Sequence, residues 1–223
     1  NEESSETSRA FNVNVKGSSM MVGGYRVYPM PVESPAHGAR SLINNPDNAL
    51  ASPFGWHDTN GAVGPEFTIT RGNNTHAYED GNNPGFSPDG FAALVFDFPI
   101  NTTYMVGVDE SEPAIITNLF YWTNIIHDVT YQYGFTEAAG NFQVNNYGRG
   151  GIGNDDCRAE AQDGSGTCNA NFGTPPDGSR PTMQMYICGT RDGDIDNPVI
   201  VHEYAHGISN RLTGGPSNVN CLN

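Results

Sequence analysis

Basic side chains are scarce in this sequence. Its 223 residues include 10 Lys and Arg against 25 Asp and Glu, a formal net charge of -15. Proteins that bind nucleic acid or anionic membranes need basic patches. The charge balance therefore argues against nucleic acid and against an anionic membrane surface as partners. An acidic chain is compatible with calcium, whose ligands are oxygen atoms, although solubility alone explains most carboxylates.

Long apolar runs are also missing. No stretch of about 18 apolar residues occurs, so the sequence predicts no membrane-spanning helix. Hydrophobic residues make up 36% of the chain, and its 27 Gly and 15 Pro favour loops and turns. Aromatic residues make up 10%, which argues against disorder. We expect a loop-rich globular protein. The chain starts at Asn1 without a signal-peptide pattern, which favours prior processing.

Cysteine is rare and never forms a CxxC pair, which argues against a structural zinc knuckle. The four cysteines are Cys157, Cys168, Cys188 and Cys221. An even count favours two disulfides, and the pairs Cys157–Cys168 and Cys188–Cys221 would each close a local loop. The other two connectivities stay open, as do four free thiols. With Asn-x-Ser/Thr sequons at Asn73 and Asn101, the disulfides favour a secreted, extracellular protein.

Periodicity and turn signals predict an α+β fold. Residues 1–22 form a polar N-terminal tail, and 23–223 form one lobe. Residues 112–133 predict a long helix with Pro113 in its first turn and a broad apolar face. A second helix is expected from Pro198, capped by Asn197, to about residue 212. Strands are expected near residues 25–28, 67–70, 94–98 and 183–187.

The second helix carries the sequence His202-Glu203-Tyr204-Ala205-His206. This is an H-E-x-x-H motif, for which the composition predicts roughly 0.01 chance matches. Residues i and i+4 share one helical face, so both imidazoles reach one metal ion. Glu203 projects beside them and suits a base that acts on water. The alternative is a surface helix that carries two histidines and a glutamate by coincidence.

A third protein ligand is not evident. Ser209 and Leu212 occupy the positions where metzincins have Gly and His, so that class is excluded. After Glu203 the chain contains no acidic residue, and His206 is its only further histidine. A third ligand must come from upstream or from another polypeptide. The upstream candidates are His127, Asp128, Asp192, Asp194 and Asp196, although His127 beside Asp128 is more typical of a buried pair.

The segment from His202 to Leu222, HEYAHGISNRLTGGPSNVNCL, closely resembles the active-site segment of the fungalysins, which are secreted zinc metallopeptidases with a thermolysin-like core. The likeness extends over about residues 25–223. It includes the segments EAAGNF (137–142), AQDGSGT (161–167), NANF (169–172) and TPPDG (174–178). Thr136 departs from the Asn that the family pattern has before EAAGNF.

The resemblance implies a β-rich N-terminal lobe of a thermolysin-like zincin with a long helix and an active-site helix. Zinc would be held by His202 and His206, with Glu203 as the catalytic base. The third ligand in the family is a Glu beyond this chain, so a second polypeptide, the C-terminal part of the same catalytic domain, is expected to supply it. Substrates would be proteins or peptides.

Two further expectations concern ligands. In thermolysin-like enzymes an edge strand with an Asn-Ala pair binds extended peptides, and Asn169-Ala170 resembles that pair. The alternative is that Asn169 is a turn residue beside a disulfide. The alternating carboxylates of residues 192–196 are similar to the start of a calcium loop, or else form a solvated acidic turn.

Two rival functions remain. The chain could be a secreted, calcium-dependent, β-rich binding module with a decayed motif, or an inactive fragment left by autolysis after Asn223. Chelation separates the first rival from a zinc peptidase, because only the peptidase loses proteolysis with phenanthroline and regains it with zinc.

Overall fold

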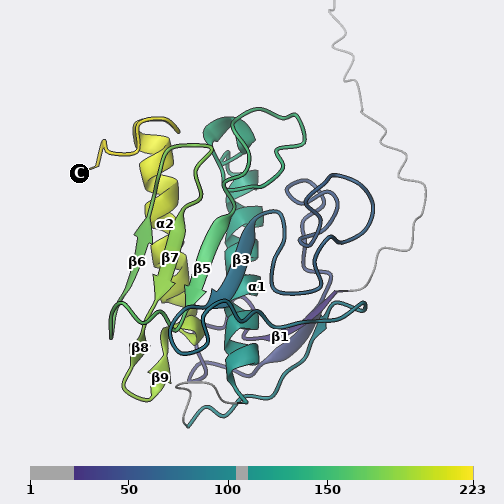
Figure 1. The fold of residues 1–223 in the computed structure, drawn as a ribbon, viewed down its shortest axis with the longest axis vertical. Helices are drawn as coiled ribbons and strands as arrows, with labels where there is room; N and C mark the ends of the chain where they lie inside the picture. Colours follow the sequence, from purple (N-terminus) through teal and green to yellow (C-terminus); the bar gives the residue numbers. More distant parts are fainter. Residues whose placement is uncertain (1–22, 104–109, 223) are drawn as a thin grey trace, which may run out of the picture.

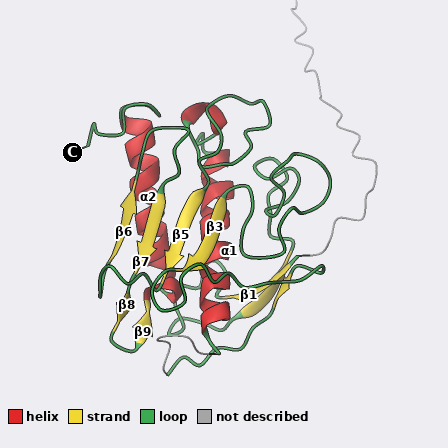
Figure 2. Cartoon of the chain, viewed as in Figure 1, coloured by secondary structure: helices red, strands yellow, loops and turns green. Residues whose placement is uncertain are grey.

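The computed structural model describes residues 23–103 and 110–222, so the predicted tail of residues 1–22 lies outside the described residues. Strands and helices are mixed as the α+β prediction requires (Figure 2). The helices are α1 (Glu112–Gln132) and α2 (Asn197–Thr213), with short 3-10 turns at Glu137–Ala139 and Gly193–Ile195. The strands are β1 (Gly24–Val27), β2 (Ser41–Asn44), β3 (Thr75–Glu79), β4 (Val95–Phe96), β5 (Cys157–Ala161), β6 (Ala170–Gly173), β7 (Thr182–Met185), β8 (Ile187–Cys188) and β9 (Arg191–Asp192).

A four-stranded sheet with the order β3-β5-β7-β6 forms the framework. Strands β3, β5 and β7 run parallel, whereas β6 pairs antiparallel with β7 and is the outermost strand. Both helices cover one face of this sheet, α1 behind β3 and β5 and α2 behind β6 and β7 (Figure 1). The three-stranded sheet β2-β1-β4 packs against α1, and β8 and β9 form a separate hairpin.

The core lies between the sheet and the helices. α1 contributes Ile116, Leu119 and Phe120, and the sheet contributes small residues such as Ala77 and Ala159. Burial of such apolar side chains is worth about 1.5–3 kcal/mol for each large one. α1 can pack closely here because the inward-facing residues of β3 and β5 are small. The long predicted helix is therefore confirmed almost residue by residue.

The predicted strands are confirmed in part. The predicted strand at residues 25–28 overlaps β1, and the one at 94–98 contains β4. Residues 183–187 are divided between β7 and β8, with Tyr186 between them. The strand predicted at residues 67–70 is wrong, because only an isolated bridge joins Ile69 to Asp89. Pairing in a sheet depends on a partner strand, and the local pattern does not reveal one.

The predicted disulfide pairs are wrong. The structure joins Cys168 to Cys188, whereas Cys157 is a buried free thiol and Cys221 an exposed one within the described part of the chain. Cys157 is the first residue of β5, and Cys168 precedes the first residue of β6. Because β6 runs antiparallel to β5 and β7 lies between them, the two cysteines lie at opposite ends of these strands.

Cys188 and Cys221 are also far apart. Cys188 lines the cavity that contains Pro198 at the start of α2, whereas Cys221 contacts Gly214 just beyond its last turn. A helix of 17 residues is about 25 Å long, so the predicted pair would have to span the length of α2.

The two sequons differ in accessibility. Asn73 is 1% exposed and its amide donates to the carbonyl of Asn145, so the folded chain has no space for a glycan there. Asn101 is exposed, and its glycosylation stays a prediction. Among the helices that the structure describes, we find none with the length and apolar character needed to cross a bilayer.

Candidate metal centre

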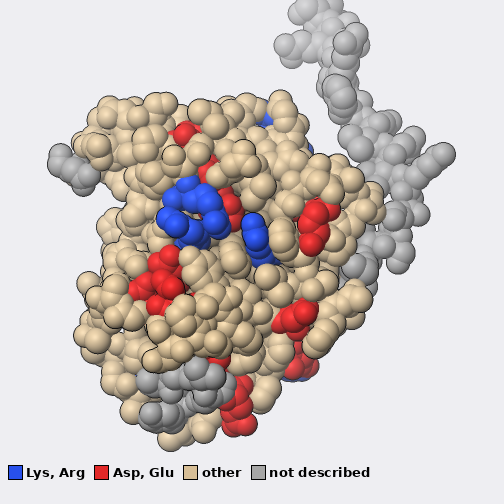
Figure 3. Space-filling model, in the orientation of Figure 1, with Lys and Arg blue, Asp and Glu red and all other residues tan. Residues whose placement is uncertain are grey.

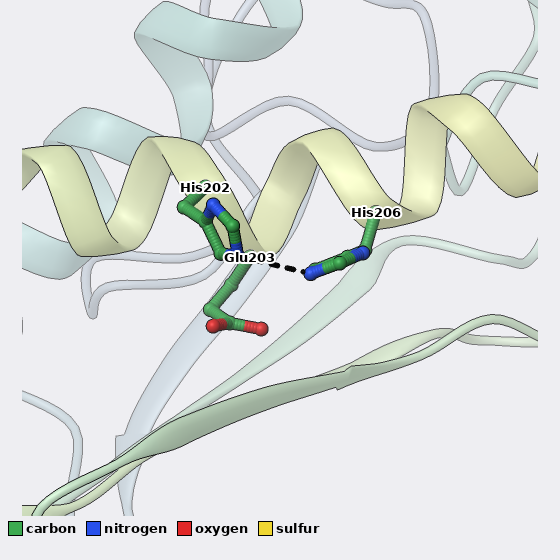
Figure 4. Close-up of side chains that lie close together, drawn as sticks. All are labelled: His202, Glu203 and His206. Atoms are coloured by element: carbon green, nitrogen blue, oxygen red, sulfur yellow. Dashed lines mark hydrogen bonds between the residues drawn. The ribbon is translucent and has the colours of Figure 1, made fainter.

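The two motif histidines meet on one side of α2 (Figure 4). Their Nε2 atoms lie 3.1 Å apart, and the rings are almost perpendicular. Two nitrogens bound to one tetrahedral zinc at 2.0–2.1 Å would be about 3.3 Å apart. Both side chains are exposed, and the donor set of two imidazoles is one that zinc prefers. The residues present therefore fit a zinc ion.

Glu203 lies beside the histidines but in a more enclosed position. Its side chain projects from the same side of α2, and the residue is 6% exposed. Burial raises the pKa of the Glu203 carboxyl, and the nearby rings of His206 and His202 oppose part of that rise. The three residues form one group with ligand atoms within 4.8 Å of one another. A carboxylate so placed can take a proton from water next to the metal centre.

A cavity of about 830 Å³ lies between the start of α2, the β8–β9 hairpin and the first residue of β6. His202 and Glu203 line it, and so do Asn169 and Ala170. The carbonyl of Asn169 accepts a hydrogen bond from the N–H of Tyr186 on the β7 side. Along an antiparallel strand successive backbone groups alternate in direction, so the N–H and C=O of Ala170 face the outer edge of β6. An extended peptide could pair with that edge.

The upstream candidates for a third ligand do not join the motif. His127 and Asp128 form the buried pair that the sequence favoured, with Nδ1 and Oδ1 2.9 Å apart. Asp128 also accepts hydrogen bonds from Ser52 and Trp56, so it ties α1 to an N-terminal loop. In the part of the chain that the structure describes, the metal-capable group at α2 contains only the three motif residues.

The three carboxylates of residues 192–196 do not form one of the metal-capable groups found among the described residues. Asp192 accepts from the N–H of Asp194 and from the amide of Gln162, and Asp194 accepts from the N–H of Gln162. Both aspartates are buried, whereas Asp196 is exposed. The turn is thus not simply solvated, and calcium binding there stays a prediction.

A second group of carboxylates lies elsewhere. Asp80, Glu160 and Asp163 have oxygens within 4.8 Å of one another.

The sheet face that lies opposite the helices carries charges of both signs, with basic side chains near its middle and acidic ones beside them (Figure 3). On this face the excess of negative charge is therefore not uniform.

Side chains from distant parts of the chain hold the two ends of α2. At its start, the amide of Asn197 donates to the carbonyls of Tyr28 and Val32 and accepts from Asn118, so this residue is a tether rather than the predicted cap. The N-cap position is Asp196. These bonds fix where the motif begins relative to the first β-sheet.

At the other end, Arg211 is completely buried. Its guanidinium lies 3.0 Å from the carboxylate of Asp155 and donates to the carbonyls of Gly140 and Pro175. Sequence reasoning missed Arg211, Tyr186 and the cavity residues of β8 and β9. The only local signal for Arg211 was a basic residue in the last turn of a predicted helix.

Comparison with known proteins agrees with this geometry. A sequence model of the fungalysin metallopeptidases (M36) matches residues 24–223. The chain is 44% identical over 209 residues to Extracellular metalloproteinase 2 of Trichophyton tonsurans and 45% identical over 216 residues to that of Arthroderma otae. It is also 45% identical over 208 residues to Probable extracellular metalloproteinase 5 of Arthroderma benhamiae. Each match covers 89% of this chain but 32% of the relative, so the chain spans about a third of their length.

Proposed function

Because this chain belongs to the fungalysin metallopeptidase family, we propose that it forms the N-terminal lobe, residues 23–223, of an extracellular zinc endopeptidase that cleaves proteins or peptides. The observation that carries the proposal is the convergence of His202, Glu203 and His206 beside a cavity bounded by an edge strand. An extended peptide can pair with such an edge strand through main-chain hydrogen bonds.

The chain's own residues divide the work of hydrolysis. His202 and His206 would hold the zinc ion, which when bound polarises the scissile carbonyl and lowers the pKa of water. Glu203 accepts the proton of the water that attacks the carbonyl carbon. It then delivers a proton to the leaving nitrogen as the C–N bond breaks. The enclosed position of Glu203 keeps its carboxylate close to that water and away from bulk solvent.

The edge of β6 would position the substrate. Ala170 offers its backbone N–H and C=O to an extended peptide, and the exposed side chain of Asn169 lies next to them in the cavity. Pairing with an outermost strand fixes the peptide direction without selecting its side chains. This arrangement suits an endopeptidase that accepts many sequences.

We propose that the third ligand is a glutamate outside these 223 residues. Two imidazoles and one carboxylate are a common protein ligand set for catalytic zinc. Glu203 is assigned to proton transfer, and its carboxylate is the only one that the described residues place in the motif group. A second polypeptide, or a continuation of the same one, would supply the glutamate, since the relatives are about three times as long as the matched region.

The test is Glu203→Gln in the full-length protein. We expect proteolysis to fall by at least about 100-fold, because a neutral amide cannot accept the proton, while bound zinc stays at the wild-type level. Zinc is measured by mass spectrometry of the native protein and activity with a quenched fluorogenic peptide. The matched control is Glu66→Gln, an exposed carboxylate outside the metal-capable groups, which should change neither quantity.

Near-normal activity of Glu203→Gln with full zinc content would exclude this role. Treatment of the wild-type protein with phenanthroline should abolish cleavage, and added zinc should restore it. A binding module would show no cleavage in either state.

A further inference from the structure

The Cys168–Cys188 disulfide lies at the rim of the proposed substrate cavity. Cys168 directly precedes Asn169 and Ala170, and Cys188 belongs to the β8–β9 hairpin. Both cysteines line the cavity together with His202 and Glu203, and both are exposed. The bridge therefore connects the start of the edge strand to the hairpin that forms the neighbouring wall.

Two backbone hydrogen bonds join the chain at Cys168 and Asn169 to the segment beside it. The N–H of Cys168 donates to the carbonyl of Ile187 at 3.0 Å, and the N–H of Tyr186 donates to the carbonyl of Asn169 at 3.2 Å. Cys168 itself has a positive φ of 51°, a left-handed backbone conformation that is unfavourable for a residue other than glycine. The chain thus bends unfavourably at the point where β6 begins.

The disulfide joins two segments, the β8–β9 hairpin and the loop before Cys168. The hairpin contains only two residue pairs, Ile187 with Asp192 and Cys188 with Arg191, and hairpins of two strands are marginal in isolation. The loop before Cys168 contains Gly164, Ser165 and Gly166. A covalent bond between these two segments restricts both at once.

We propose that the Cys168–Cys188 disulfide is the positioning device of the substrate-binding edge: it holds Asn169 and Ala170 in the conformation that an extended peptide requires. This inference rests on the proposed peptidase function. The bridge does not touch the metal ligands, so its loss should weaken binding of extended peptides and leave the metal centre and the chemical step intact. Because the bridge is exposed, reductants in solution can reach it.

The experiment compares Cys168→Ser/Cys188→Ser with wild type in the full-length, zinc-loaded enzyme. Without the bridge, the edge must be ordered during binding, and that cost lowers affinity. We expect KM for a quenched peptide of about eight residues to rise by about tenfold. We expect kcat to change by less than about twofold and zinc content to stay constant. Inhibition by acetohydroxamate, a small zinc ligand that does not reach the edge strand, should be unchanged.

Hydrogen exchange gives an independent readout. Peptides that cover residues 165–173 and 185–192 should exchange faster in the double variant, whereas peptides from α2 should not change. The matched control is Cys221→Ser, which removes the exposed free thiol outside the disulfide and should leave KM and exchange at wild-type values.

If the double variant does not fold, the disulfide is removed instead by reduction of the folded wild-type enzyme. A water-soluble phosphine reduces the disulfide to two thiols while it takes oxygen from water and becomes the phosphine oxide. KM should rise, and reoxidation should restore it. Zinc content and inhibition by acetohydroxamate, measured before and after reduction, show whether the phosphine affects zinc.

Two results would overturn the proposal. One is an unchanged KM after mass spectrometry has confirmed two free thiols. The other is a joint loss of kcat and zinc, which would make the bridge a general stabiliser of the lobe. Failure of the proposed function is distinguishable from both, because wild type itself would then cleave no peptide.

Discussion

Replacement of Arg211 tests how the C-terminal end of α2 is held in place. Its guanidinium is fully buried and donates to the carboxylate of Asp155 at 3.0 Å and to the carbonyls of Gly140 and Pro175, each at 2.9 Å. A weaker contact of 3.4 Å reaches Asp177. Methionine has a similar length and removes both the charge and every donor.

The expected cost of Arg211→Met follows from what it leaves behind. Asp155 is fully buried and would lose its charged partner. Removal of one member of a buried ion pair costs about 3–5 kcal/mol. Three backbone carbonyls, those of Gly140, Pro175 and Ser179, would also lose this donor, and their desolvation moves the expected cost toward the upper end of that range.

The assay is urea unfolding of the full-length protein, followed by hydrogen exchange of α2. The matched control is Asn210→Ala on the neighbouring position of the same helix. Asn210 donates one hydrogen bond, 3.0 Å long, to the hydroxyl of Thr174, so its loss should cost about 1 kcal/mol. If Arg211→Met costs no more than Asn210→Ala, the buried guanidinium does not hold the helix, and the reasoning is refuted.

Two further predictions concern pH and packing. His57 is buried between Tyr25 and the carbonyl of Arg71, and desolvation lowers its pKa to about 4 from an ordinary 6.5. As pH falls, the unfolded chain therefore binds a proton at His57 before the folded chain does. The free energy of unfolding should fall by about 3 kcal/mol between pH 6.5 and 4, measured from urea midpoints. His57→Gln should remove this pH dependence, and an unchanged pH dependence in the variant would contradict the prediction. Gly207→Ala would place a methyl group 2.4 Å from the ring of Phe172, so we expect the free energy of unfolding to fall by about 1–3 kcal/mol. Zinc should also bind more weakly, as measured by competition with a chelating dye. A variant as stable as wild type would show that α2 shifts freely.

The parts of the structure that sequence could predict are those with local signals. Apolar spacing and Pro113 predict a long helix at residues 112–133, and the helix is observed at Glu112–Gln132, because both signals act within the segment itself. The convergence of His202 and His206 was predictable for the same reason, since four residues along a helix return to one side.

Features that depend on sheet order could not be predicted in this way. Local loop closure favoured Cys157 with Cys168, but β7 lies between the strands that these residues begin. Arg211 looked like an ordinary basic residue in a last helical turn, and its buried partners Asp155 and Gly140 lie 56 and 71 residues away. Such contacts follow from tertiary packing alone.

The tethers of α2 have a consequence for the order in which the molecule is made. Asn197 bonds to Tyr28, which lies 169 residues earlier, and Arg211 bonds to Gly140 and Pro175. A ribosome releases all these partners before it releases the helix that needs them, and domains generally fold from their earlier segments. We therefore expect α2 to pack last, onto segments that have already folded. The position of His202 and His206 relative to the sheet is therefore fixed only after the segments that contain Tyr28, Gly140 and Pro175 are in place.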